Sequence, residues 1–452
     1  MNRMIVKHAA GRDHTAWRRG LLWLGAVALG AGAVSQAATS PDEVIRQRIA
    51  RVLAATPLMD GHNDLPEQIT ERVKATGTMP DLTVDQSKLP HKADEIPLMT
   101  DIPRLKAGHL GGQFWSAWVS VDVTGPAVIQ ATLQQIDVVK GLAARYPDTF
   151  EMAYTAADVR RIHKNGRLAS LIGVEGGHQI NDSLPVLRQY YELGVRYMTL
   201  THTTNTAWAD SATDNPAHHG LTPFGKEVVR EMNRLGMLVD LSHVSPETMR
   251  AALDVTAAPV IFSHSSARGL VDHPRDVPDD VLKLVAINHG VVMVNFAPPY
   301  VSQARNQWEA DRAAEGSRFS APPYAGLYIG QPDRAKAALA AWDSAHPMPV
   351  TTLAQVADHI EHIRDVAGID SVGIGSDFDG IPDAPVGLSG VDCYPALLAE
   401  LARRGWNDKD LAKVAGENTL RVLAAAEVVS AQLRKTQMPS TATLARLDEL
   451  TK

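Results

Sequence analysis

Eight short apolar runs recur along the chain, and a stretch with a helical pattern follows most of them. Most runs are continuous rather than alternating, which is typical of parallel strands covered on both faces. Strand and helix alternating eight times predict the α/β class and, within it, a (β/α)8 TIM-type barrel. The expected strands are residues 58–64, 114–121, 169–175, 196–202, 237–243, 259–264, 291–296 and 371–377. The expected helices are residues 41–56, 127–145, 156–165, 183–193, 223–235, 246–253, 278–288, 352–367 and 408–423.

One long stretch interrupts this alternation of strands and helices. Between Tyr300 and Val350 the chain is polar, rich in alanine, proline and arginine, and without a strand signal. Connections of this length are usually functional lids or disordered segments. We interpret about 301–350 as an insertion over the barrel mouth, with one helix near 333–342. The barrel domain would then span 38–437, with a tail over 438–452.

The first residues have the pattern of a secretory signal peptide. Arg18 and Arg19 precede an apolar run over residues 20–34, and Ser35-Gln36-Ala37-Ala38 permits cleavage after Ala37. The run is shorter than the roughly 20 residues that cross a bilayer. We therefore expect residues 1–37 to be removed and the protein to be exported, periplasmic or secreted. An uncleaved anchor, which would give membrane association, is the alternative, and the arginine pair is a weak sign of twin-arginine export.

Charge and cysteine content restrict the kind of site. A net charge of −7 and the absence of a basic run in the mature region argue against a nucleic-acid partner. The one cysteine, Cys393, excludes an intrachain disulfide framework and a cysteine-based metal site. Metal ligands would therefore come from the 17 histidines and from carboxylates.

Candidate ligands and acid–base groups stand at the ends of six expected strands. In a barrel of this kind catalytic groups lie at the carboxyl ends of the strands. A single histidine in such a place is usually a core residue, but four at the same face are not well explained that way. The residues are His62 and Asp64, Glu175, His202, His243, His264, and Asp377 with Asp379 behind it.

Five of these side chains suit a pair of metal ions. His62 and Asp64 are two apart, so on an extended chain they project to the same face. Imidazole and carboxylate groups are ligands for zinc. With His243 and His264 they can hold two ions if one carboxylate bridges, and Glu175 is the natural bridge. We expect the glycines around Glu175 to leave room for metal, and Ser242 and Ser263 to be available as partners of the histidines that follow them.

Several motifs resemble those of the membrane (renal) dipeptidase family, the binuclear-zinc branch of the amidohydrolase superfamily. The resemblance covers roughly residues 58–423 and its joint pattern is highly specific. The motifs are Asp60-Gly61-His62-Asn63-Asp64, Gly111-Gly112-Gln113-Phe114-Trp115, Gly173-Val174-Glu175-Gly176-Gly177-His178, Leu200-Thr201-His202, Phe262-Ser263-His264-Ser265-Ser266, Val292-Met293-Val294-Asn295-Phe296 and Ser376-Asp377-Phe378-Asp379-Gly380. The insertion after Tyr300 departs from the mammalian members and leaves the pocket shape open.

The resemblance implies a role for each residue. His62 and Asp64 would bind one Zn2+, His243 and His264 the other, and Glu175 both. His202 would bind substrate and stabilise the oxyanion, and Asp377 would contact substrate and move the proton. Arg275 would bind the substrate carboxylate and Tyr300 would contact the substrate. The implied activity is zinc-dependent hydrolysis of dipeptides with a free C-terminal carboxylate, L-D dipeptides among the candidates, by attack of a metal-bound hydroxide.

Other interpretations stay open at this point. The same metals would serve a lactonase or an N-acyl amino acid deacylase, although no strand end offers the lysine of a lactonase-like branch. A non-catalytic binding protein is disfavoured because every expected ligand position is filled. Arg275 could instead form a surface ion pair with Asp276 or Asp279, Tyr300 could only cover the rim, and Asp379 could cap a turn. We interpret His178, His218, His219 and His289 as solvated. A homodimer is left open.

Overall fold

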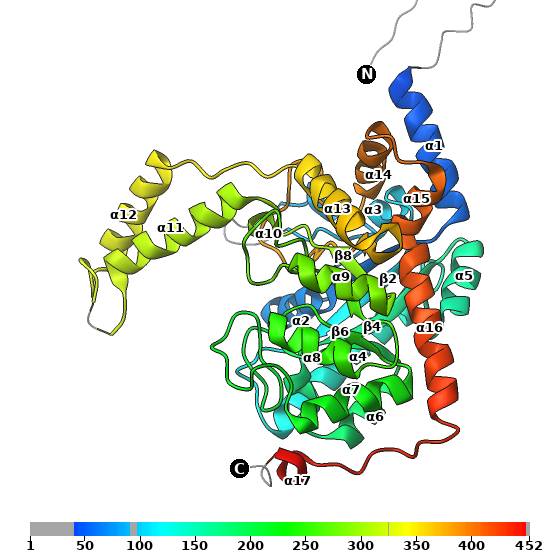
Figure 1. Cartoon of the computed structure of the whole chain (residues 1–452). Coiled ribbons are helices and arrows are strands. Elements are labelled where there is room, and N and C mark those ends of the chain that lie inside the picture. The colour runs from blue at the N-terminus through cyan, green and yellow to red at the C-terminus, as the bar shows by residue number, and fades with distance from the viewer. Residues whose placement is uncertain (1–39, 91–96, 324, 449–452) are drawn as a thin grey trace, which may run out of the picture. The chain divides into compact units, whose positions relative to one another are not determined.

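Eight parallel strands close into a barrel in the computed structural model, which describes residues 40–90, 97–323 and 325–448. The order around the ring is β2-β1-β9-β8-β7-β6-β5-β4, and pairing of β2 with β4 closes it (Figure 1). The barrel strands are β1 Leu58–Asn63, β2 Leu110–Trp118, β4 Leu168–Glu175, β5 Val195–Thr199, β6 Leu238–Asp240, β7 Ile261–Phe262, β8 Val291–Val294 and β9 Val372–Ile374. The predicted barrel is confirmed, whereas the expected signal segment lies outside the described residues.

A ninth strand was not expected from the sequence. β3 (Phe150–Met152) pairs with Leu168–Ser170, the first residues of β4, while β5 pairs with the later residues of β4 from Ile172 onward. The barrel strands themselves are almost wholly buried, because their continuous apolar sequences face the barrel interior on one side and the helices on the other. Met59, Phe114, Tyr197 and Met293 come from four different strands and join one core cluster.

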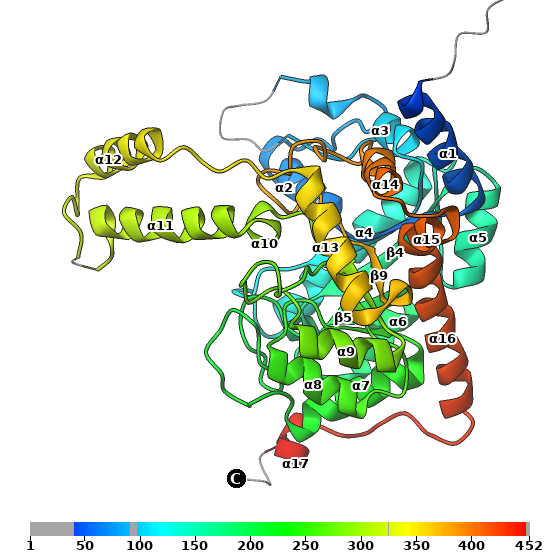
Figure 2. The ribbon, with the colours of Figure 1, turned by 45° about the horizontal axis from the view of Figure 1, so that its top comes forward.

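Helices surround the barrel (Figures 1 and 2). They are α1 Pro41–Ala55, α2 Leu65–Thr76, α3 Ile102–Ala107, α4 Pro126–Arg145, α5 Ala156–Lys164, α6 Leu184–Glu192, α7 Pro223–Leu235, α8 Pro246–Val255, α9 Asp279–Asn288, α10 Pro298–Val301, α11 Gln303–Ser320, α12 Pro332–Ala345, α13 Leu353–Ala367, α14 Tyr394–Arg403, α15 Asp408–Ala412, α16 Asn418–Leu433 and α17 Leu444–Asp448. Short 3-10 turns cover Gln86–Lys88, Gly177–Ile180 and Ile369–Ser371, and Lys413–Glu417 is a π-helical turn. No helix in the described ranges combines the length and the apolar character of a membrane span.

The insertion after Tyr300 forms a hairpin of two helices rather than the one helix expected. Trp308 of α11 and Trp342 of α12 pack with ring centroids 5.9 Å apart, and Arg312 pairs with Asp343 at 2.8 Å. Figures 1 and 2 show the hairpin reaching outward from the barrel. Its base is fixed by Arg305, which pairs at 2.9 Å with Asp383 in the loop after β9.

Candidate metal and substrate site

The five predicted metal ligands converge at the carboxyl ends of four barrel strands. His62 lies in β1, Asp64 follows β1 directly before α2, and Glu175 is the last residue of β4. His243 and His264 follow β6 and β7 after short extensions beyond the ladder. All five are buried, with at most 8% of the residue surface exposed.

Glu175 lies among three of these residues. Its Oε1 is 2.9 Å from Nε2 of His243 and 3.4 Å from Nε2 of His264. Its Oε2 is 3.4 Å from Nε2 of His62, which is itself 3.2 Å from Oδ2 of Asp64. The carboxylate of Glu175 is therefore placed to contact both pairs of ligands, as a bridging group must be.

The donor set fits divalent metal ions. Within the described ranges, three groups have ligand atoms within 4.8 Å of one another: His62–Glu175–His264, Glu175–His202–His243 and His62–Asp64–Asp377. Nε2 of His62 and Oδ1 of Asp64 are buried without a hydrogen-bond partner. Burying a polar atom in this way destabilises the folded state unless another group, such as a metal ion, binds to it. Nitrogen and oxygen atoms of this kind are zinc ligands. Which ion each side chain would bind stays a prediction.

The charge states of Glu175, His243 and His264 also suit metal binding. Burial by itself raises the pKa of Glu175, but the histidines around it, His62 first, lower that pKa well below its usual value. Burial lowers the pKa of His243 and of His264 well below the ordinary value. An ionised carboxylate and neutral imidazoles are the forms that bind a metal. His62 differs, because burial by itself lowers its pKa but neighbouring groups, Tyr197 first, raise that pKa well above the ordinary value.

Hydrogen bonds behind the ligands orient their rings. Nδ1 of His62 lies 2.9 Å from the hydroxyl of Tyr197. Nδ1 of His264 lies 2.8 Å from Oγ of Ser263, which donates to Asp240 at 2.6 Å. Both contacts turn Nε2 toward Glu175. Ser263 thus partners the histidine that follows it, as expected, whereas Oγ of Ser242 accepts from the backbone N–H of His264 and not from its own neighbour.

The glycines beside Glu175 serve a different purpose from the one expected. A Cβ on Gly173 would lie 2.0 Å from the ring of Tyr197, and one on Gly177 would lie 2.6 Å from the ring of Trp208. Gly173 therefore makes room for the aromatic ring whose hydroxyl reaches His62. The space at these two glycines is taken by aromatic rings rather than kept free for metal.

His202 lies beside the ligands but has another hydrogen-bond partner. Its Nε2 is 3.7 Å from Glu175 and accepts a hydrogen bond from the indole of Trp118 at 3.2 Å. Because an indole N–H can only donate, Nε2 of His202 carries a lone pair and the neutral ring is protonated at Nδ1. That Nδ1 is buried without a partner.

Arg275 is buried at the mouth of the barrel, with 3% of its surface exposed. Its guanidinium donates weakly to Oγ of Ser265 at 3.4 Å and to the carbonyl of His264 at 3.3 Å, and it lies 5.5 Å from the ring centroid of Tyr300. Its Nε has no partner. Asp279 pairs instead with His362 at 2.8 Å, and both carboxylate oxygens of Asp276 are buried without a hydrogen-bond partner. The alternative of a surface ion pair between Arg275 and one of these aspartates is therefore not what the structure shows.

Asp377 and Asp379 play different structural parts. Asp377 accepts a hydrogen bond from Asn295 at 2.9 Å, and burial raises its pKa to about 7. Asp379 accepts from the backbone N–H of Met99 at 2.7 Å, so it anchors the segment before α3 rather than capping its own turn. Asp377 is thus the carboxyl group that faces the ligands.

The histidines expected to be solvated differ from one another. His219 and His289 are exposed and His218 is half-buried. Nε2 of His178 lies 3.1 Å from the carbonyl of Val119, and burial lowers its pKa to about 4. His178 is half-buried like His218, whose Nε2 lies 3.0 Å from the carbonyl of Thr206, so neither ring is fully solvated, contrary to the expectation.

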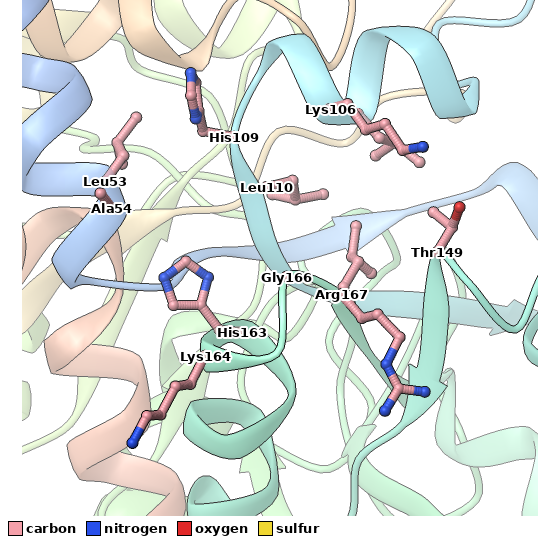
Figure 3. Close-up of a pocket in the computed structure, with 12 residues that line it drawn as sticks. Leu53, Ala54, Lys106, His109, Leu110, Thr149, His163, Lys164, Gly166 and Arg167 are labelled. Carbon is pink, nitrogen blue, oxygen red and sulfur yellow. The ribbon is translucent and has the colours of Figure 1, made fainter.

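A cavity of about 420 Å3 lies at the other end of the barrel and contains none of the predicted site residues. It borders Leu110 and Leu168, the first residues of β2 and β4. Figure 3 shows His109 and His163 at its wall. The chemistry of the molecule is concentrated at the opposite ends of these strands.

Comparison with known proteins agrees with this geometry. The family model described as membrane dipeptidase (peptidase family M19) matches residues 46–437. The chain belongs to the membrane dipeptidase family. It is also 42% identical over 385 residues to an uncharacterized dipeptidase of Schizosaccharomyces pombe, covering 82% of this chain and 81% of that protein. Membership of this metallopeptidase family makes the chain a hydrolase that uses metal.

Two solved structures of peptidases share the fold. The probable dipeptidase PvdM of Pseudomonas aeruginosa has a TM-score of 0.69 and 25% identity, covering 86% of this chain and 100% of that one. A metallo peptidase of Rhodobacter sphaeroides, liganded with a phosphinate mimic of the dipeptide L-Ala-D-Ala, has a TM-score of 0.62 and 23% identity. The match covers 82% of this chain and 99% of that one.

Proposed function

We propose that the chain is a zinc-dependent dipeptidase that cleaves dipeptides with a free C-terminal carboxylate, L-D dipeptides included. The observation that carries the substrate class is Arg275, a buried guanidinium with an unpartnered Nε beside the predicted metal ligands. Such a fork binds a carboxylate bidentately, and a buried arginine without an anion is costly. The inclusion of L-D dipeptides has support from the mimic of L-Ala-D-Ala bound by the Rhodobacter sphaeroides relative.

Two zinc ions would be held by the five predicted ligands, His62, Asp64, Glu175, His243 and His264. When bound, such ions supply Lewis acidity and lower the pKa of water. Asp377 accepts the proton that water loses and delivers it to the leaving amine. A pKa of about 7 lets this carboxyl work in both directions near neutral pH. His202 contributes an N–H group toward the substrate oxygen, and Arg275 with Tyr300 holds the carboxylate end.

The test is a panel of L-L and L-D dipeptides with the purified protein, with added zinc and after chelation. Zinc-restored turnover of free dipeptides supports the proposal. Hydrolysis of lactones or N-acyl amino acids in preference to dipeptides would replace it by the deacylase or lactonase alternative.

We further propose that the protein is exported and loses residues 1–37. Support comes from the sequence alone, namely Arg18 and Arg19 before the apolar run and the small residues around Ala37.

A further inference from the structure

Glu67 is an acidic side chain that the proposed reaction does not use. It lies in the first turn of α2, three residues after the predicted ligand Asp64, a spacing at which side chains lie on the same side of a helix, and it is half-buried. Among the described residues it makes no hydrogen bond or ion pair within the usual distances. Lys74 of the same helix is paired with Glu71 at 2.7 Å.

The surroundings of Glu67 favour a cationic partner. Burial raises the pKa of its carboxyl to about 8, and the negative charges of Asp64, one helical turn earlier, and of Glu175 add to this effect. A cation beside the carboxyl restores its charged form. A dipeptide carries such a group, its α-ammonium.

The barrel topology places Glu67 apart from Arg275. Glu67 follows β1, Arg275 follows β7, and β9 and β8 separate these strands around the ring. Two groups of opposite charge therefore approach the mouth from different sectors of the barrel. This arrangement suits a short zwitterion with a charge at each end.

We infer that Glu67 binds the α-ammonium of the substrate, so that the site selects dipeptides that are unblocked at both ends. This inference rests on the proposed dipeptidase activity and deepens it. Arg275 binds the carboxylate end of the dipeptide, Glu67 binds its amino end, and the scissile bond lies between these two residues. A site of this kind accepts two residues and discriminates against N-acyl amino acids.

The experiment compares alanyl-alanine with N-propionyl-alanine, which has the same shape but lacks the α-amino group. kcat/KM is measured for each compound that is cleaved, and Ki for each that only inhibits. Glu67→Gln should lower kcat/KM for alanyl-alanine roughly 10- to 100-fold, the effect of losing one charge-assisted hydrogen bond. The constant for N-propionyl-alanine should change by less than about twofold.

Glu71→Gln is the matched control, because Glu71 lies one turn further along α2 and pairs with Lys74. It should leave both constants unchanged. Glu67→Asp, which keeps the charge, should recover part of the discrimination.

Equal losses for both compounds in Glu67→Gln, with an unchanged unfolding temperature, would overturn the inference. If Glu67→Gln does not fold, the inference is tested on the wild-type enzyme. Binding of N-propionyl-alanine as tight as that of alanyl-alanine would also overturn the inference. A wild-type enzyme that cleaves N-propionyl-alanine but no dipeptide would instead refute the proposed dipeptidase activity itself.

Discussion

His243 and His264 bring their Nε2 atoms within 2.9 Å of each other, and both atoms face Oε1 of Glu175. Burial lowers the pKa of both rings, so in their neutral forms either one ring donates its Nε2–H to the other or a metal ion lies between the two lone pairs. Because Oε1 of Glu175 faces this pair and Oε2 faces His62, we predict two metal ions per chain, with Glu175 contacting both. Metal analysis of fully active enzyme giving one equivalent would refute the binuclear site.

Glu175→Gln should reduce activity roughly a hundredfold or more, because a neutral amide bridges two cations poorly. Chelation of the wild-type enzyme should also lower its unfolding temperature, since bound metal stabilises the folded state alone. Calorimetry with and without chelator measures this. The same unfolding temperature in both samples would mean that the five side chains hold no ion.

Arg275→Ala should weaken dipeptides more than dipeptide amides. A buried charge-assisted pair contributes roughly 1.5–3 kcal/mol, or about 10- to 100-fold in kcat/KM. Arg275→Lys should recover only part of this, because an ammonium cannot make the bidentate contact. If free dipeptides and amides lose activity equally, Arg275 has a structural role only.

Asp377→Asn should lower kcat by roughly 10²- to 10⁴-fold with a smaller effect on KM, because the amide cannot carry the proton. Asp379→Asn is the control two residues away, since its carboxylate accepts from Met99 and faces away from the reaction. It should lower stability more than turnover. Steady-state kinetics of both variants separate the two roles, and equal losses of kcat would contradict the assignment of Asp377.

His359 should make the protein sensitive to acid. Its Nδ1 accepts a hydrogen bond from the backbone N–H of Ala267 at 3.0 Å, and burial lowers its pKa to about 4. Between the unfolded pKa of about 6.5 and this value, the unfolded chain binds a proton that the folded chain does not. Stability contributed by this residue is thus complete above pH ~6.5 and falls by up to about 1.4 kcal/mol per pH unit on acidification.

His359→Asn keeps an acceptor for Ala267 but cannot titrate. Denaturant unfolding of the two proteins at pH 7 and pH 5 tests this, and the variant should lose less free energy of unfolding between the two pH values. Identical losses would show that other groups set the acid sensitivity.

Export predicts a mature chain that begins near Ala38. Mass spectrometry of the protein from its natural source measures its first residue. A chain that retains residues 1–37 would favour the membrane-anchor alternative.

The sequence predicts the barrel well because its strands are continuous apolar runs, and it predicts the ligand set because polar groups end those runs. It overestimates the length of six of the eight barrel strands, whereas β2 and β4 are each one residue longer than expected. β6 ends at Asp240 and β7 at Phe262, so His243 and His264 lie beyond the ladder, where the chain already turns. His243 has a left-handed backbone conformation, with φ of 68°, and no pattern in the sequence predicts this conformation.

Other features depend on contacts between distant segments. Tyr197 and His62 are 135 residues apart, and their hydrogen bond follows from strand register and the missing side chain at Gly173. α11 was not predicted because only Arg305 and Phe319 of its 18 residues are buried, so its sequence has no apolar stripe. β3 has only three residues, too few to show a period.

The α11–α12 hairpin separates the predicted metal ligands from Asp377 along the chain. Every predicted metal ligand precedes it, whereas Asp377 follows it on the loop after β9, which is held by pairing with β8 and β1. A chain cut between α11 and α12 would give one fragment that carries the metal ligands and another that carries the proton-transfer group. Neither fragment alone has a complete site, so turnover in a mixture of the two would report their association directly, and the hairpin is the place to build such a split enzyme.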